Sequence, residues 1–435
     1  MTTRHDMTIR RTAALAGVAL LLAACVQPAG AVPQIESTYG GQGAWYSAEM
    51  NGMAATGAAA YRGGLSTILN PAGLAAAHGL RLDVGLAADH HEEDRFQPLY
   101  DSFQSLVDDI AIASNQNTWW NTGFALSGRL AAQPLPVSFG LSLADRYPYS
   151  YRFEEEIRDP DTFADPRDRI LEERVYEVTG VLRQISGGLA VEPVPGLSVG
   201  AALHYAFGER GELWRVRDND LADGDQSYEN SNTWSLDGVG ATIGVQYQVH
   251  ERVRLGLAYE TELEVEGDLD TSAFAAGDTV PTVGGRIESL TYPAHWRFGA
   301  AFYPRSDPRT AFLVDVVYAD WTELEDSRAD SPATFMQEVL DVRIGLQHTF
   351  YNATDLRFGF RRYDSYADDD GGVSVWSGGV GFPVVGGQMS VSLELSKQQS
   401  VLPHIYEYPT DYVVEETARV DDLRYRVGLG WSREF

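Results

Sequence analysis

The feature that most constrains the fold is a run of strand-like segments in which apolar and polar residues alternate with a period of two. In the segment 290–303, for example, Trp296, Phe298 and Phe302 alternate with residues such as Arg297 and Gly299. Because successive side chains of a β-strand point to opposite faces, each segment has one apolar face and one small or charged face. The alternation predicts an all-β protein. It leaves open whether the apolar faces meet in a core or face lipid around a barrel.

Fourteen such segments follow one another from residue 80 to the C-terminus. They lie near 80–88, 118–130, 135–147, 173–190, 196–208, 233–249, 252–263, 290–303, 309–321, 338–350, 354–363, 372–382, 387–397 and 420–435.

The connections between these segments alternate between long and short. The long gap 89–117 is followed by 131–134, and the long gap 148–172 by 191–195, where Pro193 and Pro195 supply turn chemistry. Long loops on one side and short turns on the other are typical of bacterial outer-membrane barrels. We therefore predict a transmembrane antiparallel β-barrel of about 14 strands over residues 80–435, in the outer membrane of a Gram-negative cell.

The N-terminus has the pattern of an export signal. Arg4, Arg10 and Arg11 precede an uncharged stretch that is too short to cross a bilayer as a helix, which predicts a signal peptide over residues 1–31. Cleavage after Ala31 is favoured. The alternative is a lipoprotein signal that ends at Cys25, the only cysteine of the chain.

Charge and the chain end indicate the partners. A formal charge of −29, with Lys397 as the only lysine, argues against nucleic acid. The acidic runs fall between the predicted strands and are expected in solvated loops. The final segment alternates up to an aromatic residue, Phe435, which is similar to the signal recognised by the barrel-insertion machinery. Outer-membrane lipid and lipopolysaccharide are the expected surroundings.

The segment before the first strand, residues 32–79, carries small residues followed by Asn70-Pro71-Ala72-Gly73. This segment resembles the N-terminal hatch of the FadL/TodX family of outer-membrane transporters. A second resemblance lies in the segment 292–299, where a proline leads into a strand, and in the segment 314–321, which ends in Trp.

The resemblance implies a monomeric barrel with residues 32–79 as a hatch in the lumen. It implies passive uptake of hydrophobic molecules, such as long-chain fatty acids or aromatic hydrocarbons, with a sideways exit through the wall. It implies no cofactor, and the sequence contains no nucleotide-binding motif.

The hatch motif also has a physical rationale. Pro71 fixes its φ angle, Gly73 permits a tight backbone path, and Asn70 can bond its own neighbouring backbone, so the four residues Asn70, Pro71, Ala72 and Gly73 favour one compact shape. The alternative is an ordinary turn that precedes a strand.

Apolar residues within the predicted external loops are candidate ligand contacts. Phe96, Leu99, Tyr100 and Phe103 begin a near-helical spacing that runs to Ile110, and this spacing predicts an amphipathic helix. Phe274 marks a second apolar stretch. These side chains would either receive a hydrophobic ligand or pack one loop against another.

Arginines on the inward faces are a second set of candidates. Arg297, Arg343 and Arg357 could bind a ligand carboxylate. The alternative, which the abundance of inward acids favours, is pairing with residues such as Asp315 and Asp341.

No motif indicates a metal site or catalysis. The run from His90 to Asp94 contains two histidines and three acids, but adjacent residues seldom converge on one ion, so no metal is expected. HExxH does not occur and no convincing Ser/His/acid set stands out, so we expect no enzyme. The alternatives to a transporter are a barrel that acts as an interaction or anchoring protein and, third, a barrel-embedded lipid enzyme.

Overall fold

Fourteen antiparallel barrel strands, some of them interrupted, close into a barrel in the computed structural model, which confirms the predicted fold class. The structure describes residues 33–435 except 42–46, 101–102, 104, 132–134, 160–168, 221–224, 279–281, 305–307, 329–335, 368–371, 385 and 408–415. The expected signal peptide, Cys25 and the cleavage site after Ala31 lie outside the described residues. Within the described ranges, no helix combines the length and the apolar character needed to cross a bilayer.

The strand segments follow one another around the barrel in chain order. They are β1 (Arg81–Tyr100), β2 (Leu106–Ala131), β3 (Val137–Pro148), β4 (Tyr151–Arg158), β5 (Ile170–Val194), β6 (Leu197–Asp218), β7 (Tyr228–His250), β8 (Val253–Glu260), β9 (Leu263–Ala275), β10 (Thr282–Tyr292), β11 (His295–Phe302), β12 (Thr310–Asp320), β13 (Glu325–Asp326), β14 (Glu338–Thr349), β15 (Asp355–Asp364), β16 (Gly372–Val384), β17 (Gly387–Pro403) and β18 (Thr417–Glu434). The pairs β3/β4, β8/β9, β10/β11 and β12/β13 each form one interrupted strand of the barrel, so the labelled segments make fourteen barrel strands.

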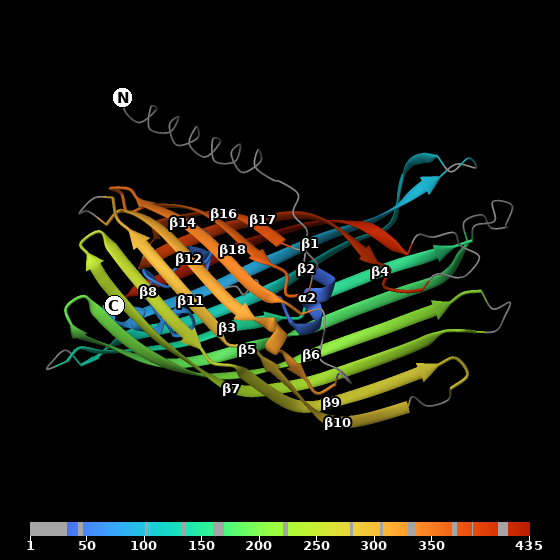
Figure 1. Cartoon of the computed structure of the whole chain (residues 1–435), viewed down its shortest axis with the longest axis horizontal. Helices are drawn as coiled ribbons and strands as arrows, with labels where there is room; N and C mark the ends of the chain where they lie inside the picture. Colours follow the sequence, from blue (N-terminus) through green and yellow to red (C-terminus); the bar gives the residue numbers. More distant parts are fainter. Residues whose placement is uncertain are drawn as a thin grey trace.

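The barrel closes where its first and last strands pair. Arg81 of β1 lies opposite Glu434 of β18, and the antiparallel ladder continues to Phe96 opposite Arg419. Short turns such as Val194–Leu197 lie at the end of the barrel that holds the C-terminus. The long hairpins β1–β2 and β9–β10 extend at the other end (Figure 1).

A belt of apolar side chains covers the outside of the barrel near the short turns. Val84, Leu203, Ile243, Phe298 and Leu429 all point outward and are at least 40% exposed. This arrangement inverts the pattern of a soluble protein, in which the apolar faces of strands are the buried ones. The alternation in the sequence therefore reflects an apolar exterior and a polar interior.

The strands extend well beyond their predicted limits, and this corrects two expectations. The predicted loop 89–117 consists largely of β1 and β2, so the helix expected from Phe96 to Ile110 is wrong. The acidic run Asp89–Asp94 also lies within β1 rather than in a solvated loop. The physical reason is that polar residues occupy both faces of a strand once it leaves the apolar belt, so the period of two is lost although the pairing continues.

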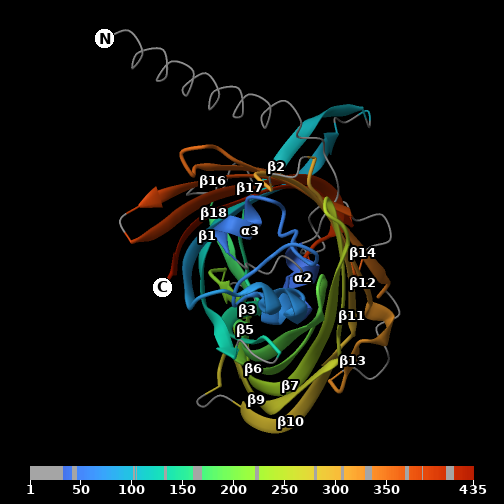
Figure 2. The same ribbon diagram turned by 90° about the vertical axis from the view of Figure 1, so that its left-hand side faces the viewer.

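Residues 33–41 and 47–77 fill the lumen. This hatch contains the helices α2 (Pro33–Tyr39), α3 (Ala48–Asn51) and α4 (Ser66–Leu69) and the 3₁₀ helix η1 (Pro71–Ala76). The end-on view shows α2 and α3 inside the ring of strands (Figure 2). Nearly all described side chains from Ala48 to Ala75 are buried.

Glycines on the inner wall leave room for the hatch. A Cβ at Gly244 would collide with the Asn70 side chain, and one at Gly256 would collide with the Ala58 carbonyl oxygen. At Gly299 it would lie 2.8 Å from the Ala58 Cβ. Glycine within a strand commonly marks the close approach of another backbone. We call the inward set Gly200, Gly244, Gly256, Gly299, Gly345 and Gly359 the glycine belt.

We predict that Gly244→Ala loosens the hatch while the strand ladders stay intact. Forcing a methyl group into a filled space should lower the free energy of unfolding by about 1–3 kcal/mol. Thermal unfolding and protease sensitivity of the purified protein measure this effect. Gly240→Ala is the matched control, because Gly240 faces the same way on β7 but a Cβ there meets nothing closer than 3.7 Å. Equal behaviour of the two variants would contradict the role of the belt.

Candidate functional site

Asn70 joins the hatch to the wall at the start of η1. Its Oδ1 accepts a hydrogen bond from the Ala72 amide at 3.1 Å, which is the expected bond to its own backbone. Its Nδ2 donates to the carbonyl oxygens of Ala58 at 2.8 Å and of Val245 at 3.1 Å. One amide thus caps η1 and holds two strands and a neighbouring hatch turn together.

The rest of the motif fits the same tight path. Pro71 occupies the first position of η1, where its missing N–H removes no helical hydrogen bond. A Cβ on Gly73 would lie 2.5 Å from the Tyr61 carbonyl oxygen and 2.8 Å from the Ser66 Oγ, so only glycine fits. Ala72 is buried beside them.

Charged side chains of the wall satisfy the hatch backbone. Asp315 on β12 accepts hydrogen bonds from the amides of Gly57 at 2.7 Å and Ala58 at 2.9 Å. Arg343 on β14 donates to the Ala55 carbonyl oxygen at 3.2 Å. Arg297 on β11 donates to the Ile68 and Leu69 carbonyl oxygens. Unpaired backbone groups in a buried plug would be costly, so these contacts fix its position.

The arginines predicted to meet a ligand are already paired with acids. Arg297 lies 2.7 Å from Glu260, and Arg343 lies 2.6 Å from Asp341. Arg357 lies 2.7 Å from Asp355 and is 1% exposed. The structure thus places all three against inward acids and also against the hatch, which Arg297 and Arg343 contact at backbone carbonyls and Arg357 contacts at Glu49.

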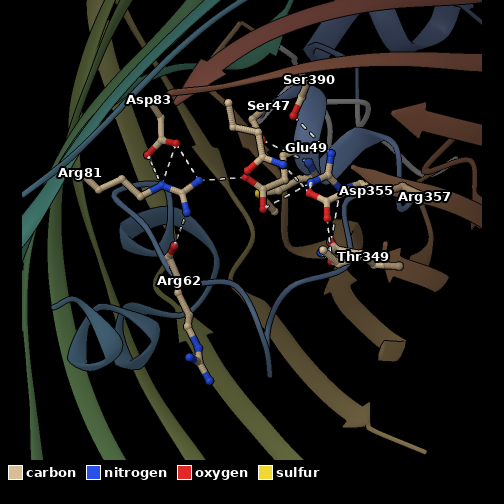
Figure 3. A network of polar contacts seen from close by, with 12 residues as sticks. Ser47, Glu49, Arg62, Arg81, Asp83, Thr349, Asp355, Arg357 and Ser390 are labelled. Atoms are coloured by element: carbon tan, nitrogen blue, oxygen red, sulfur yellow. Dashed lines mark hydrogen bonds and ion pairs between the residues drawn. The ribbon is translucent and has the colours of Figure 1, made fainter. Parts of the chain in front are cut away.

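A polar network ties α3 to two distant strands (Figure 3). Glu49 of α3 lies 2.8 Å from Arg81 of β1 and 4.0 Å from Arg357 of β15. Arg81 also pairs with Asp83 at 2.8 Å. The hatch carboxylate therefore lies between two guanidinium groups, each of which has its own acid on the wall.

We predict that Asn70→Asp destabilises hatch docking at least as much as Asn70→Ala. The aspartate keeps the shape and the cap acceptor, but it removes the Nδ2 donor and places a negative charge against the Ala58 and Val245 carbonyl oxygens. The loss should be about 1–3 kcal/mol. Denaturant unfolding measures it, with Asn352→Asp as the control, since exposed Asn352 uses only its Oδ1, toward the Thr354 amide. A stable N70D protein would contradict the assigned bonds.

Aromatic side chains form a packed cluster next to α2 in the lumen. The rings of Tyr147 and Tyr292 stack at 4.1 Å, and those of Trp321 and Tyr366 stack at 4.2 Å. The two stacks meet edge to face, with Tyr292 and Trp321 6.1 Å apart. Tyr39 of α2 packs on Tyr366 at 6.4 Å. We call these five residues the aromatic cluster.

The hatch backbone also bonds the aromatic cluster. The Tyr292 hydroxyl donates to the Tyr39 carbonyl oxygen at 3.0 Å and lies 2.6 Å from the Tyr149 hydroxyl. The cluster thus offers apolar ring faces with a few polar atoms at their edges, a composition typical of small-molecule sites.

The sequence analysis missed this cluster, although a signal for it exists. Three of its four wall members lie where a barrel strand is interrupted: Tyr147 precedes Pro148, Tyr292 precedes Pro293, and Trp321 begins the 3₁₀ helix η3 (Trp321–Glu323). Proline cannot donate to a strand ladder, so it marks a point where the pairing stops. The prolines indicate where the strands are interrupted. They do not indicate that the interruptions lie next to one another in the barrel.

A small cleft of about 50 Å³ lies between α2 and strands β15 to β18. Tyr363, Val373 and Val375 form an apolar wall, and Arg424 and Arg426 lie among its polar lining residues. Both arginines pair with Asp89, at 2.6 and 2.7 Å.

Glu36 of α2 faces this cleft without a hydrogen bond at its Oε1. Burial raises the pKa of the Glu36 carboxyl from the ordinary 4.5 to about 7, against the opposing effect of Arg424 and Arg361. The docked hatch therefore favours the protonated acid.

We predict that docking of α2 weakens as the pH rises from about 4.5 to 7 and changes little above that. The sign follows because the docked state has the higher pKa and so binds the proton more tightly over this interval. Hydrogen exchange of the peptide 33–41, measured in EDTA, tests this. The ratio between wild type and Glu36→Gln at each pH cancels the intrinsic pH dependence. A ratio that stays constant from pH 4.5 to 7 would show that Glu36 does not titrate with docking.

Of the predicted external contacts, Phe96, Phe103 and Phe274 do not belong to the aromatic cluster. Phe96 on β1 packs under the guanidinium of Arg419 at 4.5 Å. Phe103 is 86% exposed, and Phe274 on β9 is 38% exposed. Leu99 and Tyr100 end β1, and their side chains lie outside the described ones.

The wall has an interrupted ladder beside the aromatic cluster. Backbone pairing between β2 and β3 is described only from Gly123 opposite Ala144 toward the short-turn end. Farther out, side chains bridge β2 and β4: Asn115 bonds both the amide and the carbonyl of Glu154, and Asn117 donates to the Arg152 carbonyl oxygen at 3.0 Å. This part of the wall depends on amide side chains.

Comparison with solved structures identifies the architecture. A Pseudomonas aeruginosa FadL homologue matches with a TM-score of 0.64 at 12% identity, over 89% of this chain and 98% of that one. The Pseudomonas putida toluene transporter TodX matches with a TM-score of 0.62 at 14% identity, over 90% of this chain and 98% of that one. This chain has the FadL/TodX fold. The monoaromatic hydrocarbon channel CymD matches with a TM-score of 0.58 at 14% identity, over 90% of this chain and 97% of that one.

Sequence comparison does not assign the chain to a family. No protein-family model matches the chain, and no curated protein matches it. The shared fold includes almost the full length of the solved FadL/TodX structures, so the barrel and the hatch can be considered as one unit.

Proposed function

We propose that this protein is an outer-membrane member of the FadL/TodX family that takes up hydrophobic small molecules passively. The observation that carries the proposal is the aromatic cluster, enclosed between the wall and a hatch of the same chain. A barrel that transports nothing would not need a hatch that completes an aromatic cluster in the lumen. The solved structures of this fold are described as toluene transporters and a monoaromatic hydrocarbon channel, which supports the ligand class.

The path we propose begins at the long-hairpin end, outside the cell. A ligand meets the exposed Phe103 and Phe274, enters the cleft along Tyr363 and Val373, and displaces Tyr39 from the aromatic cluster. Apolar ligands gain about 25 cal/mol per Å² of buried surface in such sites, so no energy source is needed for entry down a gradient.

The exit we propose is the interrupted ladder between β2 and β3/β4. Opening it replaces a few side-chain hydrogen bonds, each worth about 1 kcal/mol, instead of a continuous backbone ladder. A hydrophobic ligand that leaves there enters the bilayer directly. Long-chain fatty acids and monoaromatic hydrocarbons are the ligand classes to be tested.

A reversible cross-link tests whether uptake needs hatch movement. A Cβ on Gly430 of β18 would lie 3.3 Å from the Ala48 Cβ of α3, close to the separation of about 3.8 Å that a disulfide requires. In cells that lack the native protein, Ala48→Cys/Gly430→Cys should transport toluene or oleate when reduced and lose most of that uptake when oxidised. Each single cysteine variant is the control for oxidation and for the added side chain.

Two outcomes separate mechanism from function. Full uptake by the oxidised double variant would contradict hatch displacement while leaving transport intact. Unchanged uptake of both oleate and toluene in the deletion strain would overturn the transporter proposal and favour an interaction role. Fractionation of the membranes checks the proposed location in the same strains.

A further inference from the structure

The run Asp89–Asp94 is divided by the pleat of β1. His90, Glu92 and Asp94 alternate with His91 and Glu93, which face the lumen and are 3% and 2% exposed. Strand β18 brings Asp422 into register opposite Glu93. The expectation that this motif does not converge considered adjacent residues. It did not consider alternate residues together with a third from the other end of the chain.

One imidazole nitrogen and two carboxylate oxygens meet at this point. The His91 Nε2 lies 2.7 Å from the Asp422 Oδ1. The candidate ligand atoms of His91, Glu93 and Asp422 all lie within 4.8 Å of one another. Ligand atoms of a tetrahedral zinc ion lie roughly 3.4 Å apart for bonds of about 2.1 Å, so small side-chain rotations would complete the geometry.

The surroundings hold these side chains in place. Glu93 accepts hydrogen bonds from the Arg95 Nε at 2.7 Å and from the Tyr151 hydroxyl at 3.0 Å. The Trp119 ring stacks with His91 at a centroid distance of 6.4 Å. Oriented carboxylates and a confined imidazole are the outer support that metal sites use.

A second observation supports a cation site here. The Asp422 Oδ2 is buried without a hydrogen-bond partner among the described residues, and the whole residue is 3% exposed. Asp422 lines the cleft beside α2, and so does Glu36, whose Oε1 also has no hydrogen-bond partner among the described residues. A buried carboxylate oxygen without a donor is costly, and a metal ion would satisfy it.

The charges allow a divalent ion. Glu93 and Asp422 contribute two negative charges and Arg95 one positive charge, while Arg424 is neutralised by Asp89. A doubly charged ion would therefore leave a net charge of only about +1 at this site. The mixed nitrogen and oxygen set suits zinc better than calcium or magnesium, which prefer oxygen alone.

We propose that His91, Glu93 and Asp422 bind one Zn²⁺ ion and so clamp the seam at which β1 and β18 close the barrel. The seam joins the two ends of the chain, and the clamp lies toward the long-hairpin end, beyond the outward belt residues Val84 and Leu86. The ion replaces the proton shared by His91 and Asp422, and Glu93 supplies the third ligand.

Calorimetry with ZnCl₂ tests the proposal on the full chain, purified in detergent without a polyhistidine tag and stripped with EDTA. We expect one ion per chain and a higher thermal midpoint with zinc. His91→Asn and Asp422→Asn should each weaken binding at least tenfold. His90→Asn, the outward neighbour on the same strand, should bind as wild type does. Co²⁺ should give the visible absorption of a tetrahedral site in wild type and lose it in H91N.

Heat-modifiable gel mobility checks that each variant has folded, and the two ligand variants guard against a failure of either one. The absence of stoichiometric zinc binding would overturn the proposal. So would an equal loss in H90N, which would indicate surface binding only. Calcium binding as tight as that of zinc and unaffected by His91→Asn would also overturn it.

Discussion

The structure depends on one constraint: a backbone that enters a closed barrel must find both space and hydrogen-bond partners there. The glycine belt supplies the space, since a side chain at Gly244 or Gly256 would occupy the position of the hatch. Asp315 and Arg343 supply partners for amides and carbonyls that no strand can reach. Wall and hatch are therefore complementary by backbone contact. An apolar lumen would leave the same hatch without partners, because buried peptide groups require hydrogen bonds.

The barrel could be predicted from the sequence wherever the two faces of a strand differ. Around Phe298 or Leu429, lipid-facing and lumen-facing residues have opposite chemistry, so the period of two is visible. Beyond the belt, as at Asp89–Asp94, both faces are polar and the alternation disappears although β1 continues to Tyr100. The strand number was therefore predictable, while the lengths and the supposed loop helix were not.

The candidate site divides in the same way. Local chemistry indicated the role of Asn70 and Gly73, because a cap and a tight path depend on neighbouring residues. Contacts across the barrel left no such local trace. His91 and Asp422 are separated by 331 positions, and Tyr149 and Tyr292 by 143. Their convergence follows from strand order and register, which hydrophobic periodicity does not define.

In the proposed mechanism, the interrupted strands of the barrel connect stability to transport. A closed barrel gains from having no free edges, so a continuous ladder would make a strong wall but no sideways exit. Here Pro148 ends β3, and the side chains of Asn115 and Asn117 replace part of the ladder. The interruption turns Tyr147 and Tyr149 toward the hatch. The feature that weakens the wall therefore also helps to form the aromatic cluster. In the proposed path, a ligand that displaces Tyr39 would thus already lie beside the interrupted ladder, where opening the wall breaks the fewest backbone hydrogen bonds. Because the aromatic cluster and the proposed exit are neighbours, no further structural element is needed to link ligand binding to ligand exit.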